Sequence, residues 1–154
     1  MDAHDRLTTA ELLRLLDIPK DGRVLSFGSS SAIFALEIAA ARPDILIVVC
    51  DIESTTTTEV ADRATAERLE NLVVGDTPAG PPVDRALCVD SLAVLLPQNL
   101  ITIRKAMLAG GYAVFVESEA PAAAPLIEKL KGLGYQVADE LPGALAGSTV
   151  IRAR

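Results

Sequence analysis

The strongest pattern of apolar and polar positions predicts a strand, a helix and a second strand early in the chain. A short apolar run, Arg23–Phe27, is followed by Gly28 and then by Ser29–Arg42, which has apolar residues on nearly every side. A helix of this composition packs closely on a sheet. The continuous β-branched run Ile45–Cys50 is typical of a parallel strand covered on both faces. The unit ends at an acid, Asp51.

Similar patterns predict elements before and after this unit. Thr8 and Glu11 have the spacing of a capping box, which predicts a short helix that ends near Pro19. Further strands are predicted at 71–76, 84–89, 112–116, 136–141 and 148–152, and further helices at 60–70, 97–108 and 126–133. We expect Gly110-Gly111 to break the second of these helices and Gly134 to cap the third.

Four consecutive threonines, Thr55–Thr58, precede the helix predicted at 60–70. Such residues are poor in a helix interior and good in loops and at N-caps. Thr56 and Glu59 also have the spacing of a second capping box. We therefore expect the threonine run to form a loop and a cap.

The order of the predicted elements indicates an α/β fold. The first five strands alternate with helices, which predicts a three-layer, mostly parallel sheet. The last two strands are joined by residues 142–147 alone, and a parallel crossover needs about a dozen residues or more, so the last strand should be antiparallel. We expect one domain, 1–154, with a short helical extension at 1–20 and a core at 21–154.

Composition narrows the range of partners. The chain has 154 residues and a formal net charge of −7, and its 14 Lys and Arg residues are scattered, so no basic face for nucleic acid is expected. No apolar run approaches the roughly 18 residues of a membrane span. The first residues are charged rather than signal-like, and we expect a cytoplasmic protein without a membrane partner.

The inventory of reactive side chains is small. The chain contains two cysteines, Cys50 and Cys88, and one histidine, His4. Both cysteines lie in apolar strand patterns and are expected to be buried free thiols. His4 lies near the N-terminus, where chains fray. We therefore expect neither a catalytic histidine nor a metal site.

Several predicted strands end at acids. Asp51, Asp76 and Asp90 follow the second, third and fourth strands. In open parallel sheets ligands bind across the carboxyl ends of the strands, so these acids are candidate ligand contacts, with solvated strand ends as the alternative. Glu117 and Glu119 follow the fifth strand, and we favour a surface position for them. Gly28 is either a simple turn or a place of ligand contact.

Five segments, in this order and at these spacings, resemble class I S-adenosylmethionine-dependent methyltransferases. They are VLSFGSSSA, VVCDIE, ENLVVGD, MLAGGYAVFVE and GYQVADELP…STVIRAR. The resemblance covers about residues 21–154. It implies a seven-stranded sheet whose antiparallel seventh strand is inserted between the fifth and the sixth. It also implies S-adenosylmethionine as the cofactor.

The resemblance also implies roles for individual residues. Gly28 would let the backbone approach the methionine part of the cofactor, Asp51 would bind the ribose hydroxyls, and Asp76 would lie against the adenine amine. Asp90 would face the substrate and is the candidate catalytic residue. The implied cofactor-binding set is Gly28, Ser29, Ser30, Asp51, Ile52, Asp76, Thr77 and Asp90.

The chain departs from the family pattern in its first turn. Ser26 stands where the family has an acid, and Ser30 and Ala32 stand where it has glycines. The hydroxyls of Ser29–Ser31 offer donors and an N-cap at the helix start instead.

Three functions are consistent with this turn. The first is methyl transfer to a nucleophile on a small molecule or protein. The second is an inactive methyltransferase-like scaffold subunit with weak or no cofactor binding, whose open site a second copy or a partner subunit completes. The third is an NAD-type dinucleotide domain, although two of the three fingerprint glycines are missing.

Overall fold

The computed structural model describes residues 8–50, 53–75, 80–90, 96–117, 123–140 and 149–154. The helices are α2 (Thr9–Leu16), α3 (Ser29–Ala41), α4 (Ser54–Ala66), α5 (Pro97–Ala106) and α6 (Ala123–Gly132). The strands are β1 (Arg23–Phe27), β2 (Leu46–Cys50), β3 (Leu72–Val74), β4 (Val83–Val89), β5 (Met107–Glu117), β6 (Val137–Glu140) and β7 (Thr149–Ala153).

Within the described residues the strands form one seven-stranded sheet in the order β3-β2-β1-β4-β5-β7-β6. The neighbouring pairs from β3 to β5 are all parallel. β7 lies between β5 and β6 and is antiparallel to both. The predicted α/β fold, a mostly parallel sheet with an antiparallel last strand, is confirmed.

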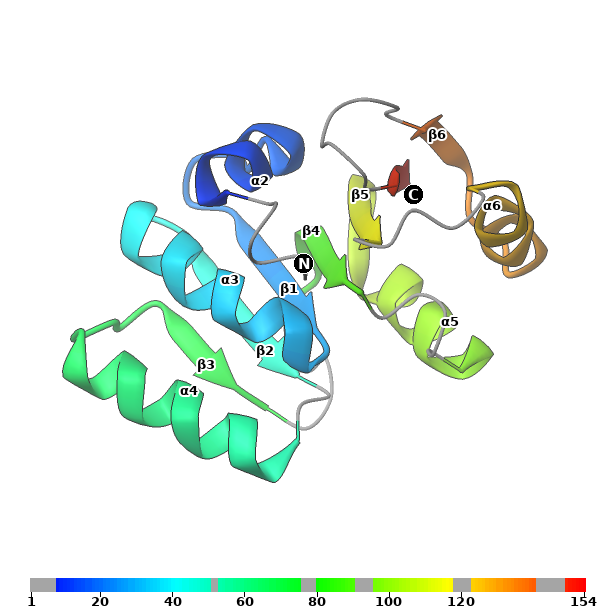
Figure 1. Cartoon of the computed structure of the whole chain (residues 1–154). Coiled ribbons are helices and arrows are strands. Elements are labelled where there is room, and N and C mark those ends of the chain that lie inside the picture. Colours follow the sequence, from blue (N-terminus) through cyan, green and yellow to red (C-terminus); the bar gives the residue numbers. More distant parts are fainter. Residues whose placement is uncertain (1–7, 51–52, 76–79, 91–95, 118–122, 141–148) are drawn as a thin grey trace.

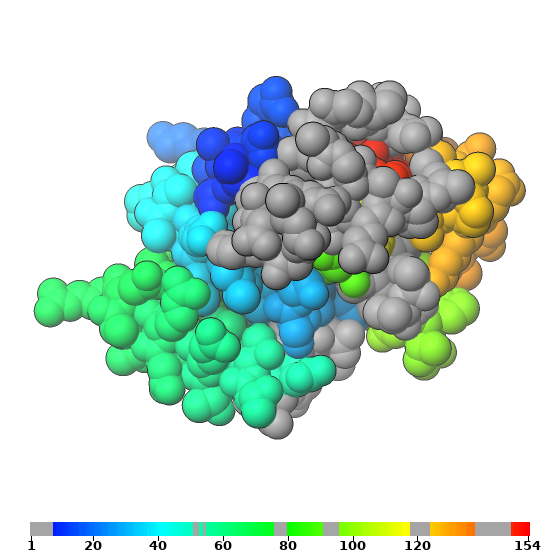
Figure 2. Space-filling model, viewed as in Figure 1, coloured from blue at the N-terminus to red at the C-terminus, as the bar shows by residue number. Residues whose placement is uncertain are grey.

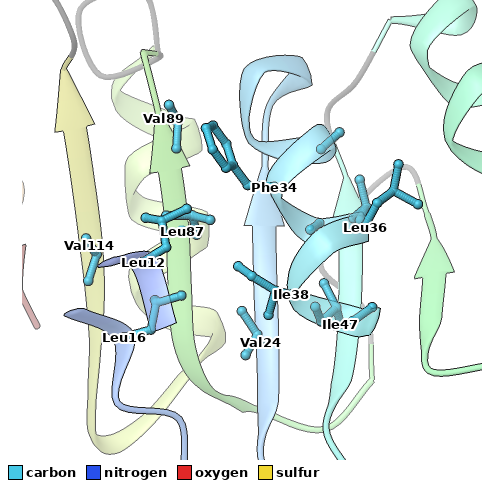
Figure 3. Close-up of a cluster of buried hydrophobic side chains, with 14 of the residues drawn as sticks. Leu12, Leu16, Val24, Phe34, Leu36, Ile38, Ile47, Leu87, Val89 and Val114 are labelled. Carbon is cyan, nitrogen blue, oxygen red and sulfur yellow. The ribbon is translucent and has the colours of Figure 1, made fainter. Parts of the chain in front are cut away.

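Helices cover both faces of the sheet (Figure 1). α2, α3 and α4 contribute to one apolar cluster, in which Ile38 of α3 lies beside Val24 and Ile47 of the sheet and Phe34 lies beside Val89 (Figure 3). α5 and α6 contribute to a second cluster on the other face. Figure 2 shows α4 at one end of the molecule and α6 at the other. None of the described helices has the length and apolar character that a bilayer crossing requires.

The ends of α2 and α6 follow from local sequence. The hydroxyl of Thr8 accepts a hydrogen bond from Glu11 N at 3.2 Å and the Glu11 carboxylate accepts one from Thr8 N at 3.0 Å, so the predicted capping box is confirmed. Gly134, at φ +90°, follows α6, and Tyr135 N donates to Leu130 O at 3.1 Å. This is a Schellman-type end, as Gly134 predicted.

α2 is held on the sheet at its C-terminal end. Arg85 of β4 donates from Nε to Leu16 O at 2.6 Å, and the Tyr112 hydroxyl of β5 donates to the same carbonyl at 2.7 Å. The Arg85 guanidinium also lies 4.0 Å from the centroid of the Tyr112 ring. The last carbonyls of a helix have no hydrogen-bond donors within the helix. At the end of α2, side chains of β4 and β5 supply these donors.

The prediction for the threonine run is wrong. α4 begins at Ser54 with Glu53 as its N-cap, so Thr55–Thr58 lie inside the helix, which ends at Ala66 rather than at residue 70. The hydroxyl of Thr57 donates to Glu53 O at 3.1 Å, one turn earlier. A threonine that bonds back to the preceding turn satisfies its own hydroxyl and is tolerated in a helix.

The second correction concerns Gly110 and Gly111. α5 ends at Ala106, and both glycines lie within β5, which begins at Met107. The pairing with β4 shifts register there. Gly110 has φ +85°, and a Cβ on Gly111 would lie 2.8 Å from Asp84 O. The glycines therefore allow an irregular strand to approach β4 rather than break a helix.

Candidate functional site

The candidate site lies where the strand order changes direction. β1 has β2 on one side and β4 on the other, so the connections from β1 and β4 leave the carboxyl edge of the sheet in different directions. This position is the topological switch point at which open α/β sheets bind ligands. Gly28 directly follows β1 and Asp90 directly follows β4. Two of the predicted site residues therefore flank the switch point.

Gly28 forms the turn from β1 into α3. Its backbone has φ 94° and ψ 157°, a region that is essentially restricted to glycine. Gly28 N donates to Cys50 O at 3.0 Å, and Gly28 O accepts from Ser31 N at 3.3 Å. The turn is buried and fixed by β2 on one side and by α3 on the other. Ligand contact at Gly28 stays a prediction.

The three serines after Gly28 have different surroundings. Ser29 Oγ accepts from Glu53 N at 3.0 Å, which ties the start of α3 to the start of α4. Ser31 Oγ donates to Phe27 O at 3.0 Å and accepts from Val89 N at 2.8 Å. Ser30 is exposed and lies in the first turn of α3 without a positive φ.

The hydroxyls of Ser29 and Ser31 therefore bond neighbouring elements at the carboxyl edge of the sheet, and Ser30 is exposed to solvent. Sequence reasoning missed the role of Ser31. The feature of the sequence that could have indicated this role is a serine four residues after Phe27, a spacing at which its hydroxyl can donate to Phe27 O.

Ser26 is the buried polar residue beneath this turn. It is 1 % exposed, and its Oγ has no hydrogen-bond partner among the described residues. It pairs in register with Val49 of β2 and Leu87 of β4, in the middle of the sheet. The position where the resembling family has a carboxylate is thus a buried neutral hydroxyl.

Asp90 has a left-handed backbone, with φ +52°. Its N–H donates to Val116 O at 2.7 Å, which fixes its main chain beside the end of β5. Aspartate tolerates this conformation better than most side chains. Residues held in such conformations concentrate at functional sites. The role of Asp90 stays a prediction.

Glu117 corrects the expectation of a surface acid. It ends β5 and is only 8 % exposed, because β4 and β7 flank this strand on both sides. Burial first, and then the neighbouring Cys50 and Glu117, raise the pKa of the Cys88 thiol far above its ordinary value. Cys50 and Cys88 are both buried and neither forms a disulfide, as predicted.

Six predicted residues lie outside the described part of the chain. β2 ends at Cys50 and β3 at Val74, and the last described residues before two of the predicted acids in the sequence are Cys50 and Gly75. The six are His4, Asp51, Ile52, Asp76, Thr77 and Glu119. Their roles stay predictions. No group of three metal-ligating side chains occurs among the described residues.

Several solved structures are similar to the chain along nearly its whole length. A methyltransferase from Aquifex aeolicus described as S-adenosylmethionine-dependent has a TM-score of 0.81 at 12 % identity, covering 97 % of this chain and 90 % of its own. The [4+2]-cyclase SpnF has a TM-score of 0.80 at 15 % identity, covering 95 % and 78 %. The glycopeptide N-methyltransferase MtfA, complexed with sinefungin, has a TM-score of 0.76 at 11 % identity, covering 95 % and 84 %.

Sequence comparison gives no such match, since neither a protein-family model nor a curated protein matches the chain. The identities to the solved structures are low, so they bear on the fold alone. The strand order, the reversed β7 and these similarities agree with one another. The chain has the Rossmann-like fold of class I S-adenosylmethionine-dependent methyltransferases.

Proposed function

We propose that the chain binds S-adenosylmethionine at the carboxyl edge of its sheet and transfers the methyl group to a nucleophile on a small molecule or protein. The turn at Gly28 carries this proposal. Its conformation is one that residues with a Cβ rarely adopt, and it directly follows β1 at the switch point, where open α/β sheets bind ligands. The buried fixation of that turn by Cys50 and Ser31 supports a preformed site.

The residues around the turn fit such a cofactor in part. Gly28 and the first turn of α3 would lie against its methionine portion, and the predicted Asp51 and Asp76 would hold its nucleoside. Carboxylates are suitable acceptors for ribose hydroxyls and adenine amines. Ser26 supplies no charge for an ammonium group, so the methionine portion would rest on backbone contacts and hydroxyls.

Methyl transfer needs few reactive side chains, because the cofactor carries the reactive group. When bound, the cofactor supplies an electrophilic methyl group on a sulfonium ion. The chain would contribute orientation, because an in-line approach of nucleophile and methyl group supplies most of the acceleration. Asp90, next to the switch point with a fixed main chain, would accept a hydrogen bond from the acceptor and orient it.

Calorimetric titration with S-adenosylmethionine and S-adenosylhomocysteine tests the proposal. We expect both to bind, and we expect Asp51→Ala to weaken binding about tenfold or more through loss of a charged acceptor. Asp62→Ala removes an exposed acid of α4 and should leave affinity unchanged. No heat at about millimolar ligand, the weak end of specific binding, would reject the cofactor assignment.

The second candidate is a methyltransferase-like binding subunit without catalysis. The neutral Ser26 and the structural use of the Ser29 and Ser31 hydroxyls favour it. A fold alone does not fix a reaction, and one similar structure is described as a cyclase. Under this alternative a second copy or a partner subunit would cover the open carboxyl edge. Cofactor binding without any methyl transfer would separate it from the first proposal.

A further inference from the structure

β3 and β4 are joined by a short connection. β4 lies three positions from β3, across β2 and β1, yet only residues 75–82 join them. The registers place Val74 level with Leu87, so the chain must cross about 14 Å laterally and return about 13 Å to Val83. Among the described residues of this connection there is no helix.

On the face of the sheet that carries α5 and α6, the side chains of β1 and β2 are buried, and exposure is found at β3. α5 contacts β5, and α6 contacts β6 and β7. Val73 of β3 pairs with Val48 of β2 and remains 49 % exposed, whereas its neighbours Leu72 and Val74 pack on the opposite face. Among the described residues, no helix thus covers Val73 at this edge of the sheet.

A pocket of about 280 Å³ lies between α5 and residues 80–83. Its floor is Leu25 and Val48, two buried residues of the sheet. Its walls are Gly80–Val83 on one side and Thr102, Lys105 and Ala106 of α5 on the other. The volume is close to the lower end of small-molecule sites, about 300 Å³. The pocket has room for one small ligand with an apolar body.

Two cationic side chains lie at or beside the pocket. Lys105 lines it, and none of its lining residues in the described part of the chain is acidic. The guanidinium of Arg23 lies against Gly80, with Nη2 3.4 Å from where a Cβ would be. Arg23 Nε is buried and has no hydrogen-bond partner in the described part of the chain. The carboxylate of Asp84 accepts from the main-chain N–H of Arg23 at 2.9 Å.

We propose that this pocket binds a small apolar carboxylate, such as a medium-chain fatty acid. Its hydrocarbon body would cover Leu25 and Val48, and its carboxylate would face Lys105 and Arg23. A buried donor without a partner is costly, and a carboxylate would satisfy it. The pocket is lined by Val83, the first residue of β4, and by the last turn of α5, whereas Gly28 and Asp90 follow the last residues of β1 and β4, so this site is separate from the proposed cofactor site.

Titration of the full chain with octanoate, followed by calorimetry and by NMR of the Leu25 and Val48 methyl groups, tests the proposal. We expect saturable binding that shifts these methyl signals, with octanamide binding more weakly because it lacks the charge. Thr102→Trp should fill the pocket and abolish binding. Lys105→Gln should weaken it about threefold to fivefold, as for an exposed ion pair.

Lys131→Gln is the matched control, because it removes an equally exposed cation from α6, away from the pocket. The proposal is overturned if octanoate shows no binding at about millimolar concentration, or if Thr102→Trp binds it as Lys131→Gln does. Equal binding of octanamide would overturn the anion assignment. Concentration-dependent dimerisation that Thr102→Trp abolishes would show that a second copy occupies the pocket instead. Failure of S-adenosylmethionine binding would leave these outcomes unchanged.

Discussion

Gly28 is the residue on which the carboxyl edge depends. It joins β1 to α3 with a backbone conformation that side chains rarely adopt, and its N–H and C=O are both bonded to neighbouring elements. The serines after it complete the same network, because Ser29 binds the start of α4 and Ser31 binds the end of β4. One short turn thus holds five elements together (β1, β2, β4, α3 and α4) at the place where a ligand would bind.

Substitution of Gly28 should therefore cost stability as well as ligand binding. We expect Gly28→Ala to lower the free energy of unfolding by about 1–3 kcal/mol, since the backbone would be strained or the turn would shift. Urea denaturation measures this change. Gly132→Ala is the control, because Gly132 ends α6 with open space around it and no positive φ. An equal effect of the two substitutions would show that the Gly28 conformation carries no special strain.

At the scale of elements, α2 depends on donors from the sheet. The Tyr112 hydroxyl donates to Leu15 O at 3.1 Å and to Leu16 O at 2.7 Å. Tyr112→Phe should lower the free energy of unfolding by about 1 kcal/mol and speed amide exchange in α2. Hydrogen exchange followed by mass spectrometry checks this.

Tyr135→Phe gives the matched comparison. Its hydroxyl donates to Leu100 O at 2.6 Å in the opposite apolar cluster, so it loses the same group at a site remote from α2. We expect a similar loss of stability with no change in α2 exchange. Unchanged α2 exchange in Tyr112→Phe would contradict the role assigned to this contact.

The helices and strands show which parts of the fold can be predicted from the sequence. β1 and α3 begin where the patterns predict, because Gly28 and the apolar periods act locally. The start of α4 was misjudged because Thr57 bonds back to Glu53 O, and helix propensity does not anticipate that contact. Burial of Glu117 likewise depends on β7, which reaches β5 from far along the chain.

The candidate site shows the same limit. The patterns identified Gly28 and Asp90 because both follow strands in the chain. They could not identify the bond from Val89 N to Ser31 Oγ, or the partnerless hydroxyl of Ser26, because these depend on how β1, β4 and α3 meet. Sequence can therefore predict which residues reach the carboxyl edge but not which of them are already engaged there.

At the scale of the whole molecule, the two thiols report on opening of the core. Cys50 and Cys88 are fully buried in the cluster of α5 and α6, on the strands that flank β1. Only the thiolate reacts with disulfide reagents, and burial raises the pKa of Cys88 well above its usual range. Reaction of either thiol should therefore require unfolding around the sheet rather than local movement at an edge.

We expect dithiobis(nitrobenzoate) to label neither thiol of the native protein on the timescale at which Asp62→Cys, a variant with a third and exposed thiol on α4, reacts. Both should react in denaturant.

The raised pKa of Cys88 also predicts that the stability of the folded protein depends on pH. The folded state keeps this proton while the unfolded thiol, with a pKa of about 8.5, loses it. The stability contributed by the neutral thiol is thus fully present below about pH 8.5 and declines as pH rises further. Urea midpoints should fall between about pH 8 and pH 10, and Cys88→Ala should reduce that fall. Rapid labelling of Cys88 at neutral pH without denaturant would show that the core around β4 opens on its own.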